Sequence, residues 1–148
     1  NLNIAITNDP ENKTLFFARG NILDNQQSSL LEEGKKAEAK EAGVKALEDY
    51  NKALELDPTY FDAAYSIGAM IFNDGAAMVN DANALTDDKA YKAAKAAAEQ
   101  RLKEALPYLE KAHELKPEDV STMTSLKDLY ARTNQMDKYQ EMNEKLKN

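Results

Sequence analysis

The chain of 148 residues contains no cysteine and no tryptophan, and it has only five glycines and four prolines. Without cysteine it can form neither a disulfide framework nor a cysteine-based metal or redox site. No apolar run approaches the roughly 20 residues that a membrane-spanning helix needs. What remains is a composition rich in Ala, Leu, Glu and Lys, which is typical of a soluble helical protein.

Basic residues are outnumbered by acidic residues. The chain has 19 Lys and Arg against 26 Asp and Glu, which gives a net charge of −7. Nucleic-acid binding starts from a basic face that neutralises phosphates. The charge balance therefore disfavours a nucleic-acid partner.

Three of the four prolines end copies of one short segment. Each copy has an alanine five residues before its proline, in Ile4–Pro10, Lys52–Pro58 and Lys111–Pro117. Before the last two prolines, a small residue, a large one and a second small one recur at the same spacing, as Ala46, Tyr50, Ala53 and as Ala105, Leu109, Ala112. Gly20 and Gly68 each lie ten residues after a proline. Self-similarity of this kind predicts stacked supersecondary units.

In these spacings the chain resembles the tetratricopeptide repeat (TPR) family over nearly its whole length. The resemblance implies antiparallel helix pairs whose two helices touch at the glycine and alanine positions. We therefore expect a single all-α domain over residues 1–148, a TPR-like antiparallel helix-pair solenoid of about three repeats. Its expected parts are the end of an upstream repeat (1–10), a first repeat (11–58), a second repeat with a long hairpin insertion (59–117) and a C-terminal repeat or cap (118–148).

The repeats are longer than the family's usual 34 residues. Pro10 and Pro58 are 48 positions apart, and Pro58 and Pro117 are 59 apart. We expect the additional residues to lengthen both helices of each pair, which would give two elongated helical hairpins. In the first hairpin, helices over 12–33 and 35–57 would meet at Gly34. In the second, a polar and acidic start signal at Thr86–Asp88 would open one helix over 90–115.

The sequence offers little chemistry, and we predict no enzyme activity, no catalytic residue, no metal and no cofactor. His113 is the only histidine, and because it does not complete a zinc-binding H-E-x-x-H pattern we expect it to be structural or at the surface. The acid pairs Glu32–Glu33, Asp87–Asp88 and Glu118–Asp119 lie at expected helix ends. Solvation or stabilisation of the helix dipole explains acids there, and acid–base catalysis or cation binding is the alternative.

The resemblance to TPR proteins implies a concave groove, lined by the first helix of each pair, that binds a peptide or a helix of a partner protein. The residues expected on that face are Phe17, Asn21, Asp24, Tyr65, Phe72, Asp128 and Arg132. The aromatic rings among them would anchor an apolar or basic partner segment. Alternatively, the same rings fill the core between repeats. The family's clamp for a C-terminal carboxylate is not supported, because Tyr65 and Ala69 stand where basic or amide groups are needed.

The elongated hairpins suggest a different function. Met78, Val79 and Leu85 near the tip of the longer hairpin, together with the alanine-rich stretch 90–98, would pack against another chain. The protein would then be a structural or assembly subunit that self-associates or docks through its hairpins, and a homo-oligomer is one possible outcome. The competing explanation is that these residues only hold the two helices of the hairpin together.

The two ends of the chain lead to two further predictions. The sequence starts at Asn1, inside what resembles the second helix of an upstream unit. We expect either that a leader has been removed, as in an exported or periplasmic bacterial protein, or that the chain is a piece of a larger array. At the other end, a charged helix over 137–147 is expected to cap the stack.

Overall fold

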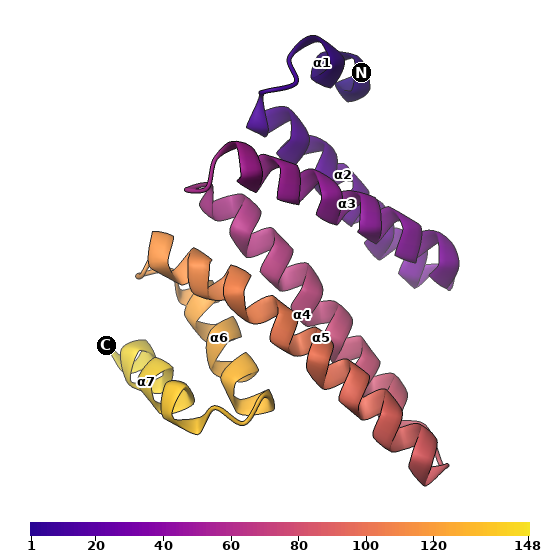
Figure 1. Ribbon diagram of the computed structural model, residues 1–148, viewed down its shortest axis with the longest axis vertical. Helices are drawn as coiled ribbons and strands as arrows, with labels where there is room; N and C mark the ends of the chain where they lie inside the picture. The colour runs from indigo at the N-terminus through magenta and orange to yellow at the C-terminus, as the bar shows by residue number, and fades with distance from the viewer. The chain divides into compact units, whose positions relative to one another are not determined.

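In a computed structural model that describes all 148 residues, the chain folds into helices alone, which confirms the all-α prediction. Figure 1 labels the helices α1 to α7 in chain order. They are α1 (Leu2–Asn8), α2 (Lys13–Glu32), α3 (Lys36–Leu56), α4 (Phe61–Asn83), α5 (Asp88–Leu115), α6 (Val120–Arg132) and α7 (Met136–Lys147). The helices form two compact units, Asn1–Ala63 and Ala64–Asn148, and the boundary falls within α4.

The first unit is built around a long antiparallel hairpin of α2 and α3, which lie side by side in Figure 1. The two helices contain 20 and 21 residues, so the predicted spans 12–33 and 35–57 are confirmed to within a residue at each end. Gly34 forms the turn with a φ of 77°, a left-handed conformation that glycine adopts at little cost. At the start of α2, the side chain of Asn12 accepts a hydrogen bond from the backbone N–H of Thr14.

Small residues bring α2 and α3 into close contact. A Cβ at Gly20 would lie 2.7 Å from the ring of Tyr50, so a larger residue would displace that ring. Ala46 and Ala53 on the facing side of α3 are fully buried. A neighbouring core cluster consists of Phe16, Ala53 and Ala63, with Ile6, Phe17, Leu54, Leu56 and Tyr60 packed against it.

The second unit contains the longer hairpin, in which α4 and α5 run side by side (Figure 1). The helices have 23 and 28 residues, and α4 continues past Gly75 without a break. The helix predicted over 90–115 is confirmed as α5, and the Asp87 side chain caps it by accepting from the N–H of Ala90. A Cβ at Gly68 would lie 2.6 Å from Cγ of Leu109. This contact is as close as the one between Gly20 and Tyr50 in the first unit.

The shorter helices α6 and α7 complete the second unit. Five side chains of α6 are buried, whereas α7 buries only Met142. Those of α6 are Thr122, Met123, Leu126, Leu129 and Tyr130. The charged helix predicted over 137–147 is confirmed as α7. None of the seven helices combines the length and the apolar character that crossing a membrane requires.

Candidate functional site

The residues predicted to bind a partner divide between the two units. Those in the first unit are Phe17, Asn21 and Asp24 from α2, and those in the second are Tyr65 and Phe72 from α4 with Asp128 and Arg132 from α6. The two sets have different surroundings and are described separately.

In the first unit, Asn21 and Asp24 both bind the hydroxyl group of the buried Tyr50. The hydroxyl oxygen lies 2.7 Å from Oδ1 of Asn21 and 3.3 Å from Oδ2 of Asp24. Partial burial raises the pKa of Asp24, and the hydrogen bond from Tyr50 partly offsets that shift. A buried phenol hydroxyl needs a hydrogen-bond acceptor. These two polar side chains supply it, so they stabilise the hairpin.

Phe17 packs with the core cluster of the first unit. Its ring centroid lies 5.4 Å from that of Tyr50 and 5.2 Å from that of Tyr60, and both pairs are tilted. Phe17 is half-buried, and its contacts match the core-filling role that the sequence left open for it. Substituting Phe17 would therefore disturb the packing of the unit as well as any surface it contributes to.

An ion pair that sequence reasoning missed lies close to this set. The Arg19 guanidinium binds both carboxylate oxygens of Asp49, at 2.7 Å from Nε to Oδ2 and 2.7 Å from Nη2 to Oδ1. Its Nη1 donates to Oδ1 of Asn3 at 3.0 Å. The arginine thus links α1, α2 and α3. One available signal was the position of Asp49, an acid directly before Tyr50 within the small-residue pattern of α3.

The second unit brings three of the predicted residues together. Arg132 and Asp128, one turn apart on α6, form an ion pair with 3.1 Å between Nε and Oδ1. The Arg132 guanidinium also lies over the ring of Phe72 on α4, 5.7 Å from its centroid, within the range of a cation–π contact. Tyr65, seven residues before Phe72, lies on the same side of α4 and is half-buried. Aromatic and charged groups of two helices therefore share one partly exposed face.

His113 on α5 faces the C-terminal helix. Its Nε2 lies 3.4 Å from Nζ of Lys145, and its Nδ1 is buried without a hydrogen-bond partner. Burial lowers the pKa of His113, the nearby ammonium of Lys145 lowers it further, and Glu141 acts in the opposite direction. The polar group beside the imidazole is the ammonium of Lys145 on α7, so His113 contributes to the contact between α5 and α7.

This arrangement predicts a pH effect on stability. Because the folded pKa of His113 is depressed, the unfolded chain binds a proton first as the pH falls through the ordinary value of about 6.5. Stability is therefore expected to drop below that pH. Urea unfolding at about pH 7.5 and about pH 5.5 should show a smaller loss for His113→Gln than for the parent chain. An equal loss in both proteins would show that other groups cause the change.

At least one acid of each pair that was a candidate for catalysis has an ordinary structural partner. The Asp119 carboxylate caps α6 by accepting from the N–H and the hydroxyl of Thr122, at 2.9 and 2.7 Å. Glu33 pairs with Lys35 at 2.7 Å, and Asp87 caps α5. No group of three or more His, Asp or Glu side chains is arranged to hold a metal ion.

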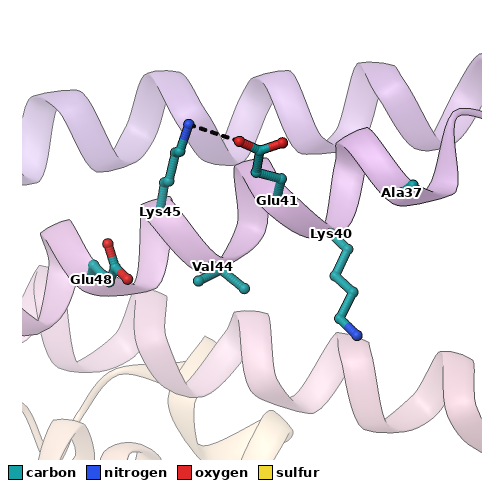
Figure 2. A pocket seen from close by; sticks show the side chains of 6 residues that line it. All are labelled: Ala37, Lys40, Glu41, Val44, Lys45 and Glu48. Atoms are coloured by element: carbon teal, nitrogen blue, oxygen red, sulfur yellow. Dashed lines mark ion pairs between the residues drawn. The ribbon is translucent and has the colours of Figure 1, made fainter.

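Two hollows lie on the surface of the helices. One, of about 430 Å³, runs along α3 and is lined by Ala37, Lys40, Glu41, Val44, Lys45 and Glu48. Figure 2 shows that all six side chains come from this single helix, and that Lys45 and Glu41 are joined by an ion pair of 3.1 Å. Such alternating charges are typical of a solvated helix face. The other hollow, of about 350 Å³, lies near the tip of the longer hairpin.

Comparison with known proteins gives no family assignment. No protein-family model matches the chain, and no curated protein matches it significantly. Its function therefore has to be inferred from its own sequence pattern and from the arrangement of its side chains.

Proposed function

We propose that the chain is a non-catalytic protein-interaction module of the TPR kind, which binds a peptide or helix of a partner protein. Two packing contacts at equivalent positions support the repeat architecture. Gly20 meets Tyr50 in the first unit, and Gly68 meets Leu109 in the second. Each glycine lies ten residues after a repeat proline, and each partner lies eight residues before the next one. A recurring contact of this kind is expected where one helix pair is repeated along a chain.

The contact between Arg132 and Phe72 carries the proposal that the chain binds a protein. It joins α4 and α6, which in a TPR array are the first helices of successive pairs and line the binding face. Arginine and aromatic side chains at such a place are the residue types that dominate protein interfaces. Tyr65 lies about two helical turns from Phe72 on the same side of α4, and Asp128 pairs with Arg132. This face therefore suits an apolar or basic segment.

The proposal is tested by removing the charged pair without disturbing the core. Asp128 and Arg132 are both exposed, so the double change to alanine should cost little stability. A partner captured on the parent chain from its native extract, and then purified, should bind the double variant at least about tenfold more weakly. Affinities measured by calorimetry would give this ratio.

A matched control is available in the same unit. Glu144 and Lys147 form another exposed ion pair, with 3.3 Å between the charged atoms. Changing both to alanine should leave the affinity unchanged. If the two double variants bind the partner equally well, the face between α4 and α6 is not the binding site.

A further inference from the structure

The C-terminal helix α7 is attached to the second unit by few buried groups. It lies beside α6 (Figure 1). Met142 is its only buried side chain, at 4% exposed, while Tyr139 and Leu146 are half-buried. A segment that buries little apolar surface opens at a lower free energy than the whole chain unfolds. The polar contacts of α7 therefore affect how often this helix opens.

Two polar contacts join α7 to α5. Near the start of α7, the ammonium of Lys138 lies 3.7 Å from Oε1 of Glu110 and over the ring of Tyr130 on α6. Near its end, Nζ of Lys145 lies 3.4 Å from Nε2 of His113. The first contact joins opposite charges. The second joins a cation to a base, so its strength depends on whether the imidazole is neutral or protonated.

The contact with Lys145 assigns the tautomer of His113. An ammonium group can only donate, so Nε2 of the neutral ring is the acceptor and the ring proton is on Nδ1. Nδ1 is buried and has no hydrogen-bond partner. An unsatisfied buried donor destabilises the arrangement that buries it. The position of the ring between α5 and α7 therefore relies on the contact at Nε2.

Protonation of the ring removes this contact. Nε2 then carries a proton and no longer accepts, and an imidazolium faces the ammonium of Lys145 across 3.4 Å. Glu141, one turn before Lys145 on α7, pairs with that lysine at 3.5 Å and favours the charged ring. Burial and the ammonium outweigh this carboxylate, so the pKa of His113 lies below its ordinary value.

The charged groups of α5 and α6 do not offset the repulsion. On α5, Glu110 lies one turn before the imidazole, but it accepts from the hydroxyl of Tyr130 at 3.0 Å and pairs with Lys138. After the imidazole in the chain, Glu114 and Lys116 carry opposite charges and are exposed. On α6, the polar group of this contact is the Tyr130 hydroxyl, which donates to Glu110. No cation or carboxylate of α5 or α6 is thus free to replace Lys145 as the partner of the ring.

We propose that His113 and Lys145 form an acid-sensitive clasp, which holds α7 against α5 while the imidazole is neutral and releases α7 when the imidazole is protonated. In the open form the ring titrates at its ordinary value, so opening is favoured as the pH falls below about 6.5. Opening uncovers Met142 and the ring of Tyr130, which Lys138 covers in the closed form. Acid therefore exposes an apolar surface on α6 that is hidden at neutral pH.

Oxidation of methionine by dilute peroxide measures how often α7 opens. Met142 is buried in the closed form, and exposure of the sulfur controls its conversion to the sulfoxide. In the parent chain, its oxidation rate should rise at least about threefold between about pH 7.5 and about pH 5.5. Met136, which is 48% exposed, gives the reference rate at each pH. Met123 on α6 is buried and should keep its rate, because α6 stays folded. Mass spectrometry of proteolytic peptides measures all three.

Three variants assign the effect to the clasp. His113→Gln removes the titrating group and should make the rate ratio of Met142 to Met136 equal at the two pH values. Lys145→Gln removes the repelling ammonium and should reduce the rise. Lys147→Gln removes another exposed lysine of α7 and should leave the rise unchanged. His113 is the only histidine, so its pKa can be read from a single imidazole resonance by NMR. That pKa should increase in Lys145→Gln and stay the same in Lys147→Gln.

A ratio of Met142 to Met136 oxidation that does not change with pH in the parent chain would overturn the clasp. So would a rise of Met123 in step with Met142, because acid would then loosen the whole unit and not α7 alone. An unchanged pKa of His113 in Lys145→Gln would show that the ammonium does not act on the ring. If His113→Gln does not fold, the two lysine variants decide the matter by the same oxidation rates and titrations.

Discussion

Replacing Arg19 by methionine is expected to lower the free energy of unfolding by about 3–5 kcal/mol. Asp49 is only 5% exposed, and the guanidinium of Arg19 binds both of its carboxylate oxygens. Methionine keeps most of the length of the side chain but leaves this buried carboxylate without a counter-charge. Removing one partner of a buried ion pair costs far more than removing an exposed pair. Urea unfolding followed by circular dichroism gives the difference directly.

Two controls separate the buried charge from a general loss of packing. The double variant Arg19→Met/Asp49→Leu removes both charges and should regain most of the lost stability. Lys45→Met removes an exposed ion pair with Glu41 on the same hairpin and should cost less than about 1 kcal/mol. If Arg19→Met costs no more than Lys45→Met, the pair between Arg19 and Asp49 does not stabilise the chain in the way that its geometry indicates.

This ion pair also illustrates the limit of what the sequence predicts. Arg19 and Asp49 are 30 positions apart, and no local spacing connects them. Whether the two side chains come together depends on how α2 and α3 are rotated about their axes. The contact of Gly20 with Tyr50 fixes that rotation only once both helices have formed. Local patterns predict where helices begin and end, but a polar contact across two helices needs their packing as well.

The helix boundaries could be predicted because their causes are local. Asp87 caps α5 with its own side chain, and Gly34 supplies the one backbone conformation that the first hairpin turn requires. Both act within a few residues, so the sequence reveals them directly. The continuation of α4 through Gly75 was predictable for a similar reason, since apolar residues keep the helical period on both sides of that glycine.

The candidate site was harder to predict than the helices. Phe17 and Phe72 both lie on first helices at apolar positions of the same pattern, yet their surroundings differ. Phe17 contacts Tyr60, a residue from the turn after Pro58 that no period relates to it. Phe72 contacts the cation of Arg132 instead. The helical period therefore identifies the residues of a face, whereas the neighbours contributed by turns and other helices decide which of them are part of the core.

The glycines of the first hairpin allow a sharp test of the packing that supports the proposed repeat. Gly20 and Gly43 are both buried within the pair of α2 and α3, and alanine at either position would improve helix propensity by up to about 1 kcal/mol. A Cβ at Gly20 meets the ring of Tyr50, which is 1% exposed and is held through its hydroxyl group by Asn21. A Cβ at Gly43 meets only the flexible amide end of Gln27.

The two alanine variants should therefore change stability in opposite directions. Gly20→Ala forces the Tyr50 ring away from its hydrogen bond and is expected to destabilise the chain by about 1–3 kcal/mol. Gly43→Ala is expected to be neutral or to stabilise it by up to about 1 kcal/mol, because the Gln27 amide can turn toward solvent. Urea unfolding of both variants beside the parent chain measures the contrast. Equal effects would show that Tyr50 has room to move, and the recurring glycine contact would then no longer support a repeat built on close helix packing.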